Sequence, residues 1–128
     1  SPGEGGSRML ERKVIQDISV IDINGDIDFR EMVRIKDVIG SLIDKDRIKV
    51  VLNLKAVDTI NCLSIGVLVE RLWILRSLNG DLKLAGMSPN LREVFKVVGM
   101  DQFFENYLSL EEAIESFEED WEGSGMTH

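Results

Sequence analysis

The stretch Ile48–Leu54 reads IKVVLNL, and the sequence VDTINCLSIG follows it at Val57–Gly66. The first run is apolar on both sides of the pleat except at Lys49 and Asn53, a pattern typical of a central strand with helices packed on its sheet. The second run is a polar turn that leads into an apolar helix pattern. This order predicts an α/β fold in which a helix N-terminus follows the end of a buried strand.

The segments on either side of this core alternate between strand and helix patterns. A strand stub is also expected after the Asn24-Gly25 turn. We predict a mixed sheet of four or five strands with about four helices. The expected strands are Met9–Gln16, Ile18–Ile23, Ile48–Leu54, Asp81–Gly86 and a short edge strand at Gln102–Phe104; the expected helices are Asp28–Asp44, Cys62–Asn79, Ser88–Val98 and Ser109–Phe117.

The composition indicates one globular domain and bounds its partners. The chain has 128 residues, 44% of them hydrophobic, and a net charge of −8. This charge argues against nucleic acid or an anionic membrane surface as the main partner. No apolar run reaches the ~20 residues that a membrane span needs, and the N-terminus lacks the apolar segment of a signal peptide. We expect a cytoplasmic protein without direct membrane insertion.

The two ends of the chain differ in composition from the middle. Residues 1–8, SPGEGGSR, are Gly-rich and lack apolar side chains, so we expect a flexible lead or a tag remnant. One domain should span residues 9–118. Residues 119–128 begin acidic and end small and polar, and they are expected to form a flexible tail.

The motifs of known catalytic and metal sites are missing from the sequence. A nucleophilic cysteine needs a base, but the one histidine, His128, is the last residue. One cysteine and one histidine cannot form a structural zinc site, and no phosphate-binding glycine motif is found. The spacing of Asp22, Asp26 and Asp28 lacks the glycine and glutamate of a calcium loop. We therefore expect no enzymatic activity, no metal and no cofactor.

Cys62 and the helix that it begins each allow two interpretations. A thiol at a helix N-terminus can gain thiolate character and react with oxidants. A cysteine in such a place is more often a small, half-buried apolar residue. The helix also carries a second apolar stripe, Leu63, Val67 and Ile74, which either contacts another part of the same domain or forms a surface for a partner.

Several motifs, in this order, resemble the STAS domain of bacterial anti-sigma factor antagonists. They are GDID at 25–28, VVLNL at 50–54, VDTINCLSIGVL at 57–68, GDLKLAGMSPNLREVF at 80–95, GM at 99–100 and SLEEAI at 109–114. The resemblance runs from about Leu10 to Phe117. It implies a STAS fold, in which a mixed sheet carries its helices mainly on one face.

The resemblance also implies a regulatory switch at the start of the second helix. In this family an anti-sigma factor kinase phosphorylates the serine of an Asp-Ser-[Ser/Thr]-Gly-Leu-Gly turn, and the unphosphorylated antagonist binds that kinase and frees the sigma factor. Here Asn61 replaces the Asp, Cys62 the phosphorylated Ser, Leu63 the next residue and Ser64 the Gly, whereas Ile65 and Gly66 fit. A thiol is not a serine-kinase acceptor. The usual switch should therefore be absent at Cys62, with Ser64 and Thr59 as alternative candidate phosphosites.

The function implied by the resemblance is that of a non-enzymatic protein-interaction module, a monomer or weak dimer. Its expected partner is an anti-sigma factor of the GHKL-type serine kinase class, or a related phosphatase. The residues expected to contact this partner are Asp26, Asp28, Asn61, Cys62, Leu63, Ser64 and Val67. Two alternatives stay open: a redox-responsive module that acts through Cys62, and a STAS accessory subunit of a transporter or another signalling complex.

Overall fold

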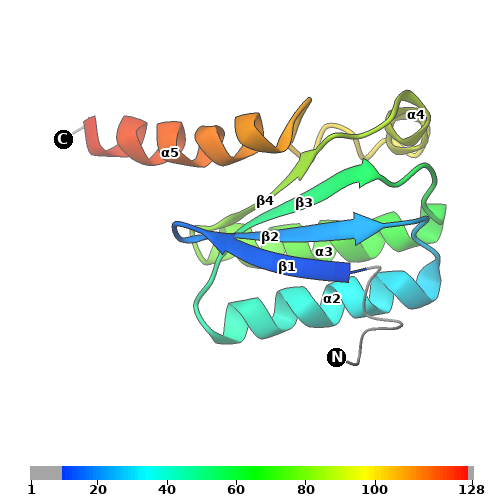
Figure 1. The fold of residues 1–128 in the computed structure, drawn as a ribbon, viewed down its shortest axis with the longest axis horizontal. Helices are drawn as coiled ribbons and strands as arrows, with labels where there is room; N and C mark the ends of the chain where they lie inside the picture. The colour runs from blue at the N-terminus through cyan, green and yellow to red at the C-terminus, as the bar shows by residue number, and fades with distance from the viewer. Residues whose placement is uncertain (1–9, 127–128) are drawn as a thin grey trace.

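A computed structural model describes residues 10–126 and has a five-stranded sheet with helices on both faces (Figure 1). The predicted α/β fold is confirmed. The strands are β1 (Leu10–Ile15), β2 (Ile18–Asn24), β3 (Lys49–Ala56), β4 (Asp81–Ala85) and β5 (Asn106–Tyr107). The helices are α2 (Phe29–Asp44), α3 (Cys62–Ser77), α4 (Pro89–Val97) and α5 (Leu110–Met126).

The sheet is mixed, as predicted, because only its first strand runs against the others. The strand order is β1-β2-β3-β4-β5. β1 pairs antiparallel with β2, and the remaining neighbours pair in parallel. The strand stub expected after Asn24-Gly25 is one isolated parallel bridge between Ile27 and Ile60. The parallel order requires a helical crossover between successive strands, and α2, α3 and α4 provide them.

Two hydrophobic clusters fill the two faces of the sheet. The larger one includes buried side chains from α2, α3 and α4, such as Ile39, Leu68 and Phe95. The smaller one is formed by Ala113 and Phe117 of α5 and by strand residues that point to the opposite face. The helices therefore lie mainly on one face, as the resemblance implied. The start of α3 belongs to the larger layer.

Two predicted boundaries were wrong. The segment Gln102–Phe104 is a turn rather than an edge strand, because Phe104 leaves the sheet edge and packs against Phe95, with ring centroids 5.8 Å apart. Pairing with β4 begins only at Asn106. The last helix does not stop at Phe117 but continues to Met126, since the acidic residues that follow include strong helix formers.

Some expectations concern residues that the structure does not describe. The lead at residues 1–8 lies outside the described part, as do residues 127–128. The domain limits at residues 9 and 118 stay predictions. Within residues 10–126, no helix combines the length and apolar character that a membrane crossing requires.

Candidate functional site

The candidate site is built from two loops that leave the sheet side by side. Ile27, in the loop after β2, pairs with Ile60, in the turn before α3. The backbone N of Ile27 donates to the oxygen of Thr59 at 3.0 Å, and the backbone N of Asn61 donates to the oxygen of Ile27 at 2.9 Å. These bonds bring the Asp26–Asp28 loop against the turn at 59–64, the two segments that the sequence singled out.

The two aspartates of the first loop are exposed, and each also holds local structure. The Asp26 Oδ1 accepts from the backbone N of Thr59 at 3.2 Å and of Asp58 at 3.4 Å. The Asp28 Oδ1 accepts from the backbone N of Glu31 at 2.7 Å and so caps α2. Asp26 therefore ties the second loop to the first, whereas Asp28 fixes the start of a helix.

Asn61 and Cys62 form the start of α3. The Asn61 side chain is the N-cap and accepts from the backbone N of Leu63 at 2.9 Å. Cys62, the first helical residue, is a free and exposed thiol. The interpretation of Cys62 as a half-buried packing residue was therefore wrong. The reason is its position, because the inward stripe of the helix begins only at Ser64 and Ile65.

Ser64 does not belong to the accessible surface. Its side chain is buried beneath the first turn of α3, on the same stripe as Leu68 and Leu72, and its Oγ lacks a hydrogen-bond partner. In this conformation neither a kinase nor a docking partner can reach that hydroxyl. Ser64 is accordingly withdrawn from the predicted contact residues and from the phosphosites. Thr59, the other candidate phosphosite, is an exposed residue.

Apolar side chains that are exposed or half-buried lie on the first turns of α2 and α3, the helices that follow the two paired loops. Leu63 is 84% exposed, and Val67, one turn later, is half-buried. α2 packs beside α3, and its first turns expose Phe29, at 59%, and Val33. We call these four residues the apolar ridge. Sequence reasoning missed Phe29 and Val33. The signal that could have identified them is that both are apolar residues outside the inner apolar stripe of their helix.

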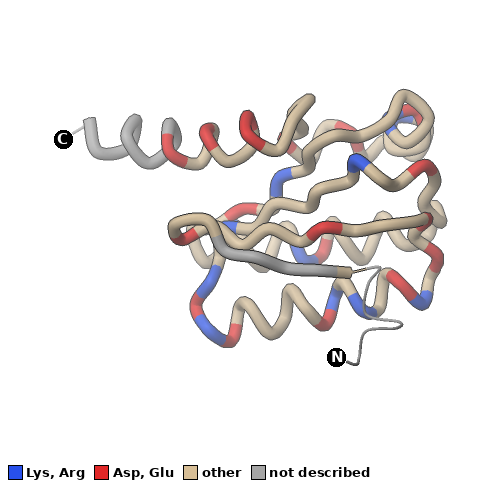
Figure 2. Tube along the Cα trace, viewed as in Figure 1, with Lys and Arg blue, Asp and Glu red and all other residues tan. Residues whose placement is uncertain are grey.

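The segments beside the ridge carry charges of both signs. Figure 2 shows Asp and Glu residues where the chain leaves the ends of β2 and β3. The exposed acids in these loops are Asp26, Asp28 and Asp58. Among residues 10–126, no group of three or more His, Cys, Asp or Glu side chains is arranged to hold a metal ion. Exposed basic residues lie there too, namely Arg30 in the first turn of α2 and Lys55 near the end of β3. The site thus offers apolar contact beside a capped helix start, with charges of both signs nearby.

Comparison with known proteins gives a family match over most of the chain. The model of the STAS domain family matches residues 9–113. None of the curated protein sequences is similar enough to count as a match.

Solved structures share the fold along nearly their whole length. A candidate anti-sigma factor antagonist of Thermotoga maritima has a TM-score of 0.77 at 24% identity, and the match covers 84% of this chain and 93% of that chain. The anti-sigma factor antagonist SpoIIAA in its unphosphorylated form has a TM-score of 0.74 at 21% identity, with coverages of 85% and 96%. A sulfate transporter family protein of Wolinella succinogenes has a TM-score of 0.71 at 18% identity, with coverages of 91% and 94%.

Proposed function

The chain belongs to the STAS domain family, and from that premise we propose that it is a non-enzymatic interaction module of the anti-sigma factor antagonist type. Its partner is an anti-sigma factor of the GHKL-type serine kinase class, which it binds in the cytoplasm to regulate a sigma factor. The observation that carries this proposal is the exposure of Leu63, which is 84% exposed. It lies in the first turn of α3, which the Asn61 cap and the backbone hydrogen bond from Asn61 to Ile27 hold in place.

The physical argument concerns the cost of leaving such a surface in water. A Leu side chain that is fully removed from water gains roughly 1.5–3 kcal/mol. Leu63 and Phe29 offer most of this gain, and Val33 and the half-buried Val67 add smaller apolar areas on the same two helices. The backbone beneath them is held by the Ile27–Ile60 bridge, so that a partner meets a surface that needs little ordering.

Cys62 makes this docking surface independent of the usual switch. A phosphate would add roughly −1.5 to −2 charges to a turn that is hydrogen-bonded to the loop of Asp26 and Asp28, and would oppose apolar docking. With a thiol at the acceptor position and Ser64 buried, the module stays in its binding form. We propose a constitutively active antagonist, with Thr59 as the remaining candidate phosphosite of the 59–64 turn.

Binding to the anti-sigma factor kinases of the same organism tests the docking surface. Isothermal titration should give binding at micromolar concentration or tighter, and Leu63→Glu should abolish it. Leu108→Glu is the matched control, because Leu108 is 73% exposed but lies between β5 and α5. Absence of binding to every such kinase, or equal loss in both variants, would reject the proposed surface.

Phosphorylation tests the switch separately. The purified chain is incubated with the kinase that binds it and with ATP, and phosphate is located by peptide mass mapping. We expect no incorporation in the native chain and one phosphate at position 62 in Cys62→Ser. Phosphate at Thr59 of the native chain would contradict constitutive activity, while a Cys62→Ser variant that stays unmodified would contradict recognition of the turn by the kinase.

Two further observations each favour an alternative function. The exposure of Cys62 suits a redox-responsive module; peroxide should then change partner binding in the native chain and not in Cys62→Ser. The likeness to a sulfate transporter family protein suits an accessory subunit of a transporter. Recovery of membrane-embedded partners by affinity purification would favour that assignment over a sigma-factor circuit.

A further inference from the structure

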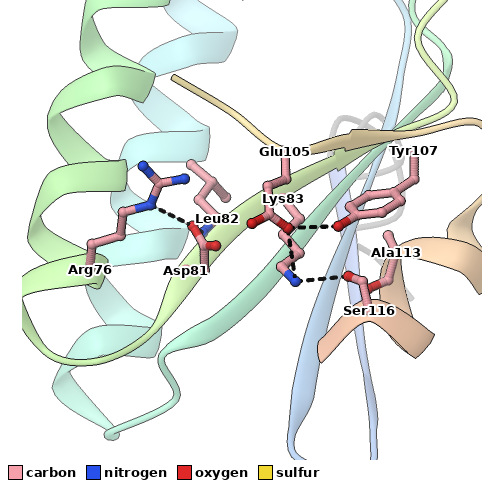
Figure 3. Close-up of polar contacts among 8 residues, drawn as sticks. All are labelled: Arg76, Asp81, Leu82, Lys83, Glu105, Tyr107, Ala113 and Ser116. Atoms are coloured by element: carbon pink, nitrogen blue, oxygen red, sulfur yellow. Dashed lines mark hydrogen bonds and ion pairs between the residues drawn. The ribbon is translucent and has the colours of Figure 1, made fainter. Parts of the chain in front are cut away.

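Lys83 carries an ionisable group in the interior, far along the chain from the docking turn. Its side chain is 0% exposed at the centre of β4. The Nζ donates to the Ser116 Oγ at 2.8 Å and lies 3.2 Å from the Glu105 Oε1 (Figure 3). It also lies 4.2 Å from the centroid of the Phe117 ring. Two of these partners belong to α5, and Glu105 precedes β5.

Over residues 110–118, where the side chains of α5 are described, none belongs to the large cluster that holds the other helices. α5 packs on the opposite face of the sheet, where Ala113 and Phe117 meet Ile18, Val20, Val51 and Ala85. The helices α2, α3 and α4 are packed into the larger cluster instead. If α5 left the sheet, the larger cluster would therefore keep its buried contacts.

The match to the STAS family model ends close to this contact. The STAS family model matches residues 9–113 and so ends in the first turn of α5. Ser116 and Phe117, which approach the Lys83 ammonium, both lie beyond it.

We propose that α5 is a detachable cover of the sheet, and that the Lys83 ammonium makes its docking conditional on Glu105 and Ser116. A buried ammonium is strongly unfavourable unless its hydrogen bonds are satisfied. When α5 leaves, Lys83 regains water, so the charge favours the open form in a way that an apolar residue would not. When α5 is docked, the carboxylate and the hydroxyl offset that cost.

The rest of the cluster supports the docked state. Ser116 in turn donates to the oxygen of Ala113 at 2.7 Å, and the hydroxyl of Tyr107 donates to the Glu105 Oε1 at 2.6 Å. Burial, together with the hydrogen bond to Glu105, raises the pKa of Tyr107 above its ordinary value of 10.0. Tyr107 therefore stays a neutral donor that orients the carboxylate toward Lys83.

Amide hydrogen exchange and lysine acetylation of the full chain test this proposal. In the native chain, amides of α5 should exchange faster than those of β3. Lys83 should be acetylated more slowly than the exposed Lys96, at a rate that follows α5 opening.

Glu105→Gln should raise the rate of amide exchange in α5 about tenfold. The effect is modest because the Glu105 side chain is 46% exposed. The exchange of β3 should not change. Glu93→Gln, an exposed acid on α4, is the control and should alter neither.

A second pair of variants separates the charge from general packing. Lys83→Met removes the ammonium but keeps an apolar side chain, so α5 exchange should fall or stay equal. Ser116→Ala should raise α5 exchange in the native background and have no such effect in Lys83→Met. The proposal is overturned if α5 and β3 exchange at one common rate, or if Glu105→Gln accelerates both equally. Faster α5 exchange in Lys83→Met would overturn it as well. If Lys83→Met does not fold, Glu105→Gln and Ser116→Ala decide the question alone.

Discussion

Ile27, in the loop after β2, and Ile60, in the turn before α3, form an isolated parallel β-bridge. This bridge fixes the position of the docking turn at residues 59–64. Both side chains are buried, so the pair adds packing to the backbone hydrogen bonds of Thr59 and Asn61 with Ile27. The start of α3 is thus attached to the core on the side away from Cys62. The consequence is that the residue at position 62 can change without disturbing the turn.

Replacing the cap of α3 should lower stability in a way that depends on hydrogen bonding. Asn61 accepts from the backbone N of Leu63 at 2.9 Å, and Asn61→Ala should cost about 1 kcal/mol in the free energy of unfolding. Asn61→Asp should retain that stability, because aspartate caps equally well and its charge suits a helix N-terminus. Urea unfolding measures both; an alanine variant as stable as the native chain would contradict the role of the cap.

Truncation of two leucines on the same helix should change the free energy of unfolding by very different amounts. Leu68 is 1% exposed and belongs to the large cluster, so Leu68→Ala should cost about 2–5 kcal/mol. Leu63 is 84% exposed, and Leu63→Ala should change the free energy of unfolding by less than about 0.5 kcal/mol. Unfolding curves compare the two. A large loss in Leu63→Ala would mean that this side chain serves the fold rather than a partner.

The elements predicted correctly are those with strong local patterns. Asn61, Asp28 and Ser88 cap α3, α2 and α4 in the structure, and the sequence identified each of these starts. The apolar run at Ile48–Leu54 identified the central strand in the same way, because burial on both faces leaves few polar positions, here Lys49 and Asn53.

The predictions that missed depended on tertiary contacts. Ser64 and Cys62 are two residues apart at one helix start, and which of them is buried depends on how the helix is rotated against the sheet. Phe104 leaves the sheet edge because Phe95 of another element receives it. The position of Lys83 beneath α5 has no local signal, since it requires a helix more than 25 residues later. Periodicity in one segment cannot encode such pairings.

Acid should remove the small contribution of one surface ion pair. Asp17 accepts from the Lys49 Nζ at 2.9 Å, and this hydrogen bond lowers the pKa of Asp17 below its ordinary value of 3.8. The folded state therefore binds that proton less tightly than the unfolded state. The stabilisation is present above pH 3.8 and is lost as the pH falls below it.

The matched variant for that pair is Asp17→Asn, which keeps the shape and removes the charge. Because the Asp17 side chain is 68% exposed, the loss at neutral pH should not exceed about 1 kcal/mol. Unfolding by urea at pH 7 and at pH 3 gives the comparison. The difference between the native chain and Asp17→Asn should shrink in acid; a difference that grows instead would contradict the assigned direction of the pKa shift.

Gly80 and Gly66 should differ in sign when each is replaced by alanine. A Cβ at Gly80 would overlap the carbonyl oxygen of Ile48, which accepts from the backbone N of Asp81 at 2.9 Å and cannot move freely. Gly80→Ala should therefore cost about 3 kcal/mol or prevent folding. At Gly66, within α3, a Cβ would meet nothing within 4 Å, and Gly66→Ala should stabilise the chain by about 0.5–1 kcal/mol.

Gly66 also connects stability to docking. It is exposed one turn from Cys62 on α3, and no atom of the described chain requires a glycine there. A glycine that costs helix stability without a packing reason is explained if a partner approaches the backbone closely at that point. We expect Gly66→Ala to unfold at higher urea concentration and to bind the anti-sigma factor kinase more weakly, as measured by isothermal titration. A variant that is more stable and binds as well as the native chain would show that the partner leaves room for a methyl group at Gly66.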